Sequence, residues 1–367
     1  MKEKRLRNVF LSSIRQDSGK TMVSLGLYQA CLDKKLKTSF IKPVGQKYVS
    51  VGDLNIDKDS YLIGEVFQCS QKFEEMSPVT IGRGYTEKYI LSKKKEPLRD
   101  KIIKSFKKIS KGSEAIIVEG TGHAGVGSVV DVSNADVAHM LGSKVIIVCE
   151  GGLGKSIDEI MLNKALFDNR GVEVLGVIIN KVLPEKYDRI KKILTKGLAD
   201  KGIALLGVIP HEPLLSSPSV EQIMKPLKLR LLSGGESVHR RIKHTIVAAM
   251  EPHNMVHHLK SGTLVITSGD RVDNILLAVS SHLIRAEDGS HISGMVLTGG
   301  LMPNPKIVNL LKKSQIPVLI TDSDTYTIAA KFERLTCKIQ KTDKEKIQKA
   351  ARLVKKYVDV KTILEKA

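Results

Sequence analysis

An apolar stretch at residues 8–11 (Asn-Val-Phe-Leu), the sequence Ser-Gly-Lys-Thr at residues 18–21 and a helix-like stretch at 22–27 decide the fold of this chain. A strand, a tight loop, Gly-Lys-Thr and a helix together bind nucleotide phosphates, because loop N–H groups and the helix N-terminus form a positive concavity. Lys20 adds a mobile charge for the terminal phosphates, and the hydroxyl of Thr21 is suited to Mg²⁺. The stretch therefore predicts a phosphate-binding loop in an α/β protein.

The loop departs from the usual spacing. The usual pattern has a glycine five residues before the second glycine, which falls on Ile14, or on Ser13 if the loop is one residue longer. Neither residue is glycine, although serine is small enough for a tight exit from a strand. The alternative is an ordinary turn with a surface lysine. The strand–loop–helix context favours nucleotide binding.

Length and composition predict a globular protein of about two domains. The chain has 367 residues, of which 42% are hydrophobic and 27% charged, which is typical of soluble proteins. No apolar run approaches the ~18 residues of a membrane span, and no signal-type segment follows the charged residues 1–5. The four cysteines are scattered, without a CxxC pair, which argues against a disulfide framework or a zinc site. We expect a cytoplasmic protein without a membrane partner.

The net charge of +20 raises the question of a nucleic-acid partner. Lysines run through 93–95, 101–111 and 341–366, on amphipathic helical patterns. Tryptophan is absent and aromatic residues make up only 4% of the chain, so platforms for stacking bases are scarce. A solvated, lysine-rich surface is the favoured interpretation, and nucleic-acid binding is not expected.

The first ~210 residues alternate between strand and helix patterns. Apolar runs that read as strands cover 9–12, 38–41, 115–118, 144–148, 174–179 and 204–208, and helical patterns cover 19–31, 59–67, 98–109, 135–141 and 156–167. Alternating units with apolar strands predict a parallel sheet covered by helices on both faces. Ligands of such sheets bind at the carboxyl ends of the strands.

Polar residues follow five of these strands directly. They are Lys20, Lys42, Glu119, Glu150 and Asn180. Because the carboxyl ends of parallel strands share one edge, we expect these side chains to surround one site.

Acidic residues near this edge are candidates for magnesium binding. Glu119 ends a buried strand opposite the loop, where a carboxylate is well placed for Mg²⁺ or its water shell. Asp57 and Asp59 are candidates for a second ligand, with Asp59 preferred. The alternatives remain open: Glu119 as a loop or capping carboxylate, and either aspartate as the cap of the next helix.

Two further strand-end residues suit a nucleotide. Lys42 precedes Pro43, which stiffens the chain there, and its charge suits a phosphate or an acidic substrate. Asn180 offers a donor and an acceptor to an adenine edge. The alternatives are a surface lysine and a turn residue that closes the strand.

The second half of the chain predicts a smaller α/β domain. Four prolines between residues 210 and 226 break the periodicity and indicate a connecting segment. Strand-like runs follow at 245–250, 263–267, 292–297 and 317–320, with helical patterns at 273–283, 306–314, 322–332 and 344–357. The expected boundaries are 1–215 for the first domain, 216–340 for the second and 341–367 for a C-terminal helix.

Taken together, these motifs resemble the dethiobiotin-synthetase-like family of P-loop proteins over residues 7–212. That family has the longer loop seen at 13–21, Lys-Pro-Val after the second strand (42–44) and Val-Glu-Gly-x-Gly at the third (118–122). It also has an Asn and an Ile-Pro after later strands, here Asn180 and 209–210.

The resemblance implies bound ATP and Mg²⁺. Mg²⁺ would be held by Thr21, Asp59 and Glu119, with Lys20 and Lys42 as the catalytic lysines and Lys42 near the γ-phosphate. In that family ATP activates a carboxylate or carbamate for attack by nitrogen, through an acyl phosphate. The implied nucleotide-binding residues are Ser13, Gln16, Asp17, Ser18, Gly19, Lys20, Thr21, Met22, Asn180 and Pro210.

Residues 218–335 resemble a DRTGG domain, a regulatory module similar to half of a nucleotide-sensing CBS module. The naming motif stands here at 270–274 without its glycines, and Thr-Gly-Gly follows at 298–300. The pairing resembles the N-terminal regulatory portion of long bacterial phosphate acetyltransferases. The sequence ends where the acetyltransferase domain would begin, so that activity is not expected. Biotin synthesis is not expected either, because residues 45–48 replace the serine-containing substrate segment of that family.

Two functions fit these features. The first is an ATPase or ATP-dependent ligase-like enzyme acting on a small carboxylate, with a C-terminal regulatory domain. The second is a non-catalytic sensor of a nucleotide or metabolite that regulates a metabolic enzyme such as phosphate acetyltransferase. A homodimer is the expected assembly. The substrate-facing loops at 45–55 and 122–133 match no pattern that names a substrate.

Overall fold

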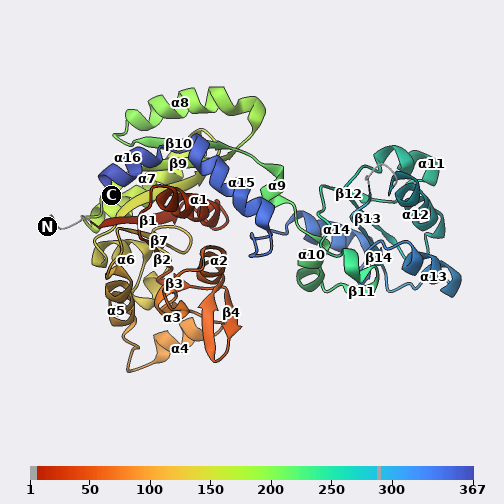
Figure 1. Ribbon diagram of the computed structural model, residues 1–367, viewed down its shortest axis with the longest axis horizontal. Coiled ribbons are helices and arrows are strands. Elements are labelled where there is room, and N and C mark those ends of the chain that lie inside the picture. The colour runs from red at the N-terminus through yellow and green to blue at the C-terminus, as the bar shows by residue number, and fades with distance from the viewer. Residues whose placement is uncertain (1–5, 287–290) are drawn as a thin grey trace. The chain divides into compact units, whose positions relative to one another are not determined.

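The computed structural model describes residues 6–286 and 291–367; the charged residues 1–5 noted above lie outside the described part. The chain divides into two compact units (Figure 1). Unit 1 extends to Glu212 and also contains Ile339–Ala367, and unit 2 is Pro213–Lys338. The C-terminal segment, expected as a part of its own, therefore belongs to the first unit.

Unit 1 is built on a six-stranded sheet in the order β10-β9-β8-β1-β7-β2, with every neighbouring pair parallel. This arrangement confirms the α/β class expected from the sequence. Buried parallel strands are apolar along their whole length because helices cover both faces. The strands are β1 (Arg7–Ser13), β2 (Thr38–Ile41), β7 (Ala115–Glu119), β8 (Lys144–Glu150), β9 (Val174–Val182) and β10 (Leu205–Pro210).

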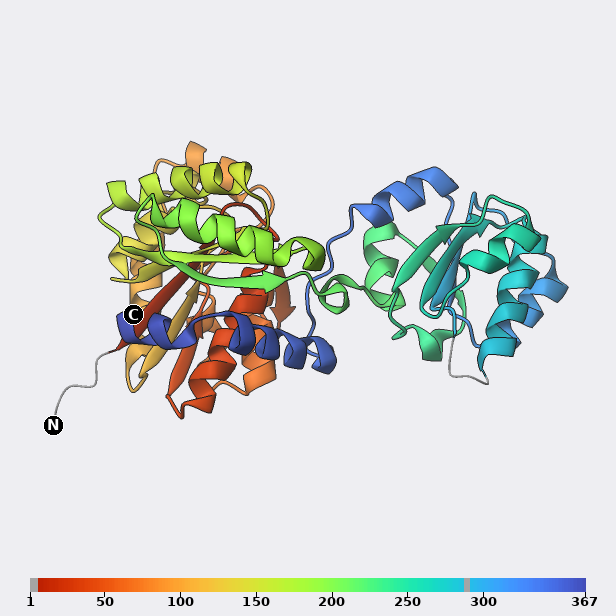
Figure 2. The same ribbon diagram turned by 90° about the horizontal axis from the view of Figure 1, so that it is seen from above.

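Helices cover both faces of this sheet, as Figure 2 shows. One face carries α5 (Leu98–Ser110), α6 (Asn134–Met140), α7 (Gly154–Asn169) and α8 (Tyr187–Ala199), whose apolar residues share one core with the strands. The other face carries α1 (Lys20–Asp33), α15 (Lys344–Tyr357) and α16 (Val360–Lys366). Figure 1 shows α15 next to α1, and the two helices pack against each other.

The packing of α15 on α1 depends on a glycine. A Cβ atom at Gly26 would lie 2.3 Å from a methyl group of Val354, so any larger residue would push the two helices apart. Val354 is fully buried. The C-terminal helices thus complete the core of unit 1 on this face.

The segment between β2 and α5 forms a small subdomain, where the sequence suggested a polar stretch and then one helix at 59–67. Residues 48–57 form a β-hairpin of two antiparallel strands, in which exposed and partly buried residues alternate along the first strand. Alternation of this kind over only four residues is a weak signal, and the sequence analysis missed it. The elements are β3 (Val44–Gly45), β4 (Tyr48–Val51), β5 (Leu54–Asp57), α2 (Lys58–Phe67), α3 (Phe73–Met76), β6 (Val79–Thr80) and α4 (Tyr85–Leu91), with η1 (Ser128–Val130) and η2 (Pro184–Lys186) elsewhere in unit 1.

Unit 2 has a five-stranded sheet in the order β11-β15-β14-β13-β12, parallel except for β11. Its strands are β11 (Arg230–Ser233), β12 (His244–Val247), β13 (Thr263–Ser268), β14 (Gly294–Thr298) and β15 (Val318–Ile320). Its helices are α9 (Pro213–Ser216), α10 (Val220–Leu227), α11 (Pro252–Met255), α12 (Val272–Ala286), α13 (Pro305–Lys313) and α14 (Thr325–Glu333), with η3 (Gly235–Ser237) and η4 (Val256–His258). Two apolar clusters lie on opposite faces of this sheet, one including residues of α12 and α13 and the other residues of α10 and α14.

Helix α10 corrects the interpretation of residues 210–226 as a connecting segment. Ser219 and Gln222 form a capping box, in which each side chain bonds the backbone N–H of the other residue. Such a cap satisfies N–H groups that the first helical turn leaves without partners. Pro226 lies in the last turn of the helix. The spacing Ser-x-x-Gln was the signal that the prolines obscured.

No helix among the described residues is long and apolar enough to cross a membrane.

Candidate functional site

The loop between β1 and α1 has a strained conformation that only glycine tolerates at its last position. Gly19 has φ +99°, and a Cβ atom there would lie 2.0 Å from the side-chain nitrogen of Asn180. That nitrogen donates a 3.0 Å hydrogen bond to the carbonyl of Ser18. Asn180 is buried, and it is the last residue of β9 that pairs with β8. Its side chain therefore holds the loop backbone in place from another strand of the sheet. The structure therefore uses part of the hydrogen-bonding capacity that the sequence interpretation assigned to adenine.

Ser13 occupies the position where the phosphate-loop pattern has its first glycine. The ammonium of Lys20 donates a 2.7 Å hydrogen bond to the Ser13 hydroxyl, which also lies 3.0 Å from the carbonyl of Gly122. Lys20 is 7% exposed, so its charge is held against the loop. Serine here gives the lysine a polar contact that glycine would lack.

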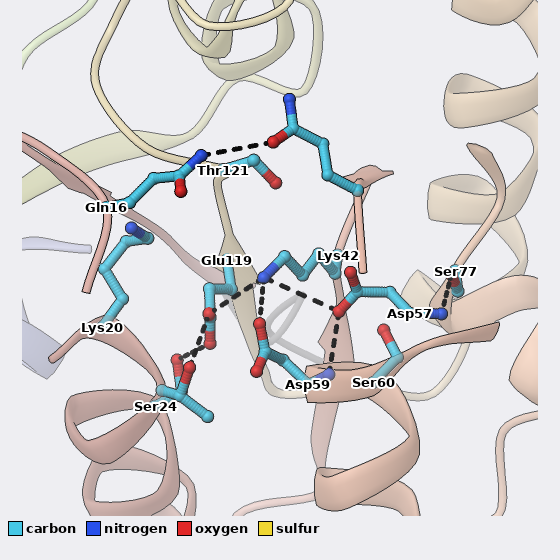
Figure 3. Close-up of polar contacts among 12 residues, drawn as sticks. Gln16, Lys20, Ser24, Lys42, Asp57, Asp59, Ser60, Ser77, Glu119 and Thr121 are labelled. Atoms are coloured by element: carbon cyan, nitrogen blue, oxygen red, sulfur yellow. Dashed lines mark hydrogen bonds and ion pairs between the residues drawn. The ribbon is translucent and has the colours of Figure 1, made fainter. Parts of the chain in front are cut away.

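Three carboxylates surround one ammonium at the strand ends beside this loop (Figure 3). Lys42, which follows β2, forms an ion pair with Asp59 and lies 3.3 Å from Glu119 and 3.6 Å from Asp57. All four residues are at most 5% exposed. The sequence placed these side chains at one edge, and the structure shows them in direct contact.

The cluster holds one ammonium in contact with three carboxyl groups. Burial by itself lowers the pKa of Lys42, but the charges of Asp59, Glu119 and Asp57 raise it well above its ordinary value. The lysine is therefore charged, and its ammonium is stabilised by the carboxylates around it.

Helix α1 holds Glu119 by both carboxylate oxygens. The hydroxyl of Thr21 donates to Oε1 over 3.1 Å, and the hydroxyl of Ser24 donates to Oε2 over 2.6 Å. The two residues are three positions apart and so lie on one face of the helix. The sequence analysis missed Ser24; its spacing from Thr21 was the available signal.

The two aspartates near α2 have different structural roles. Asp57 is the N-cap of α2, and its carboxylate accepts a 2.8 Å hydrogen bond from the N–H of Asp59. The N–H of Asp57 donates to Ser77 Oγ over 2.9 Å. Asp59 lies in the first turn of α2 and its carboxylate contacts Lys42. Capping and cluster formation, which were alternatives at the sequence level, thus occur together.

The glycine-rich turn after Glu119 is clamped by a side chain that the sequence analysis did not single out. Asn134 accepts a hydrogen bond from the N–H of Thr121 and donates to the carbonyls of Thr121 and His123. The Thr121 hydroxyl in turn donates to the carbonyl of Val44, after β2. These bonds fix the backbone that positions Glu119.

The remaining expected residues lie around the loop. Gln16 is exposed, and its amide lies 3.4 Å from that of Gln46. The carbonyl of Asp17 accepts from Lys181, which also pairs with Glu150.

Two of the residues expected to bind the nucleotide are placed less favourably for it. Met22 is buried in α1, so only its backbone is available to a nucleotide. Pro210 ends the edge strand β10 and is half-buried, three strands away from β1.

The donor set fits Mg²⁺ bound together with phosphates. Within the described ranges, no group of three or more His, Cys, Asp or Glu side chains is arranged to hold a metal ion on its own. Mg²⁺ at phosphate sites uses one or two carboxylates and completes its shell with waters and phosphate oxygens. Thr21 and Glu119 are adjacent, and the Thr21 hydroxyl donates its hydrogen to Glu119. Its oxygen lone pairs are therefore left for a cation.

The parallel sheet, the strand–loop–helix and the strand-end cluster define a P-loop protein. Residues 7–219 match the AAA domain family, and the chain belongs to that family, the dethiobiotin-synthetase-like group of P-loop proteins. Residues 222–335 match the DRTGG domain. Both resemblances stated from the sequence are thereby confirmed.

Curated relatives with similarity over nearly the whole chain are phosphate acetyltransferases. That of Synechocystis sp. is 27% identical over 97% of this chain and 51% of its own length. That of Nitratidesulfovibrio vulgaris is 29% identical over 96% of this chain and 50% of its own length. The chain spans about half the length of the curated relatives that it matches.

Solved structures show weaker similarity. The CBS and DRTGG domains of the Clostridium perfringens pyrophosphatase, complexed with diadenosine tetraphosphate, are 17% identical, with a TM-score of 0.27 over 40% of this chain and 73% of that chain. MinD of Pyrococcus horikoshii, complexed with Mg-ADP, is 18% identical, with a TM-score of 0.33 over 57% of this chain and 84% of that chain.

Proposed function

We propose that unit 1 binds ATP with Mg²⁺ and transfers the γ-phosphoryl group to a small carboxylate. The observation that carries this proposal is the convergence of two lysines, one hydroxyl and the carboxylate cluster beside the phosphate loop. Lys20 and Lys42 lie on either side of Glu119 (Figure 3). Positioned charges of this kind are the main requirement of phosphoryl transfer, which needs little covalent chemistry from the protein.

The residues of the loop suit the phosphates. In the structure Lys20 donates to the neutral hydroxyl of Ser13, and a phosphate would offer it a charged and therefore stronger acceptor. The N–H groups at the start of α1, which follows the loop directly, would be further donors to the phosphates. Thr21, Glu119 and Asp59 would hold Mg²⁺, which supplies charge neutralisation on the phosphate oxygens when bound.

Lys42 and the carboxylates define where the transfer would take place. An oxygen of the substrate carboxylate attacks the γ-phosphorus, the bond from phosphorus to the bridging oxygen breaks, and ADP leaves with that electron pair. The products are ADP and an acyl phosphate. The ammonium of Lys42 stabilises the charge on the transferred group in the transition state.

Equilibrium dialysis with labelled ATP, with and without Mg²⁺, tests the binding part of this proposal. Lys20→Ala should abolish binding because the phosphates lose their mobile charge. Lys155→Ala is a matched control, since this exposed lysine also follows a glycine-rich turn, at the start of α7. ATP binding that survives Lys20→Ala, or the same loss in both variants, contradicts the proposal.

Single-turnover reactions with γ-labelled ATP and a panel of small carboxylates test the transfer. We expect label in an acyl phosphate, which hydroxylamine would trap, for at least one carboxylate. Release of label only as inorganic phosphate would indicate an ATPase without an acceptor.

A second candidate function is a nucleotide sensor that regulates a metabolic enzyme such as phosphate acetyltransferase. It is favoured by the curated relatives, whose similarity covers both units of this chain and about half of each relative. A chain that carries both a phosphate loop and a DRTGG domain is suited to regulation. Tight ATP binding without turnover, together with a change in a phosphate acetyltransferase's activity when this chain and ATP are added, would select this function.

A further inference from the structure

Glu119 presents two oxygens with different surroundings. Oε1 accepts from Thr21 over 3.1 Å and lies 3.3 Å from the ammonium of Lys42. Oε2 accepts from the hydroxyl of Ser24 over 2.6 Å. Figure 3 shows Ser24 and Lys42 approaching the carboxylate from different sides. Only Oε1 contacts residues proposed for the nucleotide and the metal.

We propose that Ser24 is a positioning residue for Mg²⁺: it ties back one oxygen of Glu119 so that the other faces the phosphate loop. This inference rests on the proposed binding of Mg-ATP. Ser24 is distinguished from a ligand by its partner, because it bonds the oxygen that Thr21 does not contact. Its effect on the metal is therefore exerted through Glu119.

Burial makes the hydroxyl of Ser24 difficult to replace. Ser24 is fully buried and Glu119 is 1% exposed, so water from the surface has little access to Oε2. A hydrogen bond to an ionised carboxylate is about twice as strong as one between neutral groups. Without it, the carboxylate can turn and bring Oε2 towards the ammonium of Lys42, which already lies 3.3 Å from Oε1. A carboxylate with both oxygens on that lysine is a poorer partner for Mg²⁺.

The expected size of the effect follows from other sites of this kind. Residues that orient a metal-binding side chain typically change metal affinity by about 10- to 100-fold when removed. Because Glu119 keeps its bond from Thr21, we expect the lower end of this range for Ser24→Ala. ATP affinity without metal should change by less than about 2-fold, since the hydroxyl of Ser24 bonds Glu119 rather than the loop.

The experiment compares the Mg²⁺ concentration for half-maximal ATP binding with ATP affinity in EDTA, using the full chain. Ser24→Ala should raise the first about 10-fold and leave the second unchanged. Ser60→Ala is the matched control: this fully buried hydroxyl donates to the carbonyl of Met76 over 2.9 Å and has no contact with Glu119. It should leave both quantities as in the wild type.

A second variant keeps the inference testable if Ser24→Ala does not fold. Ser24→Cys retains a side chain of similar size with a weaker donor, and should raise the Mg²⁺ requirement by an intermediate factor. In a protein that already carries Glu119→Gln, either substitution of Ser24 should change the Mg²⁺ requirement little further, because the interaction that it removes is already altered.

Three outcomes contradict the inference. Equal changes in the Mg²⁺ requirement and in metal-free affinity would assign Ser24 a structural role only. If both Ser24 variants need the same Mg²⁺ concentration as the wild type, this inference is wrong and the proposed function is unaffected. ATP binding by the wild type that does not depend on Mg²⁺ would overturn the proposed binding of Mg-ATP and this inference with it.

Discussion

Replacing Lys42 by methionine removes an ammonium that contacts three buried carboxylates, while nearly keeping the length of the side chain. Asp57, Asp59 and Glu119 all lie within 3.6 Å of that ammonium and are at most 1% exposed. Methionine fills the space of the aliphatic stem, so the change is chiefly one of charge. We expect Lys42→Met to destabilise unit 1 strongly.

The magnitude follows from the cost of leaving buried charges without a partner. Breaking a buried ion pair by removing one member costs about 3–5 kcal/mol. Glu119 keeps its bonds from Thr21 and Ser24, and Asp57 keeps its bond from the helix N–H. These bonds offset part of the loss, and we expect the lower end of that range, about 3 kcal/mol in the free energy of unfolding.

The pH dependence has a definite sign. In the folded wild type the pKa of Lys42 is raised, so its contribution is fully present at neutral pH and is lost only as the pH rises through that raised value. The difference in stability between wild type and variant should therefore persist from neutral pH upwards and shrink only as the pH rises through the raised pKa of Lys42. If Mg²⁺ binds the folded cluster as proposed, adding it should stabilise the variant as well.

Hydrogen exchange measured by mass spectrometry on the full chain suits this test, since exchange reports opening locally. Peptides from β7 and α2 should exchange faster in Lys42→Met, while peptides from β13 and β14 of unit 2 serve as an internal reference. Lys95→Met is the control, because Lys95 pairs with Asp131 on the exposed surface and should leave exchange unchanged. Wild-type protection of β7 in Lys42→Met near pH 8 would refute the reasoning.

Three further predictions concern the loop, its support and unit 2. Gly19→Ala should abolish stabilisation by Mg-ATP in thermal unfolding, because its Cβ would collide with Asn180; Gly142→Ala, with a similar positive φ but open space, should retain it. Asn134→Ala should lower the free energy of unfolding by about 1–3 kcal/mol, because buried backbone groups lose their partners. Denaturant unfolding followed by circular dichroism measures this change, and an unchanged free energy of unfolding contradicts the prediction. Burial and neighbouring cationic groups lower the pKa of His282 to about 4, so its part of the stability is present above about pH 6.5 and lost as the pH falls towards 4. His282→Phe should remove this part of the acid sensitivity in unfolding measured against pH, and an identical pH profile would exclude it.

The sequence was sufficient for the core fold because apolar strands and amphipathic helices carry their own periodicity. The six strands of unit 1 were expected within a few residues of where they lie. Short elements were missed where this signal is weak: the hairpin of β4 and β5 has four residues per strand, and the prolines around α10 hid its capping box. Both are short elements whose formation depends on local caps and pairing.

The sequence likewise predicted some residues of the candidate site and missed others. A residue that follows an apolar strand must lie at one edge of a parallel sheet, which is why Lys42 and Glu119 were found. Ser24 was not found: its spacing from Thr21 indicates a shared helix face, but only the packing of that face against β7 shows that it meets Glu119. The double role of the segment before α2, with Asp57 as cap and Asp59 as cluster member, was likewise decided by packing.

The sequence by itself determined that this chain has a phosphate-type loop on a parallel sheet and a second α/β unit, because motif order and hydrophobic periodicity are local properties. Only the tertiary structure decided which charges meet. It brought one lysine against three carboxylates from β5, α2 and β7, and it placed a serine of α1 on the far oxygen of Glu119. These contacts join segments far apart in the chain, and their energies depend on burial, which arises only when the sheet and its helices have assembled.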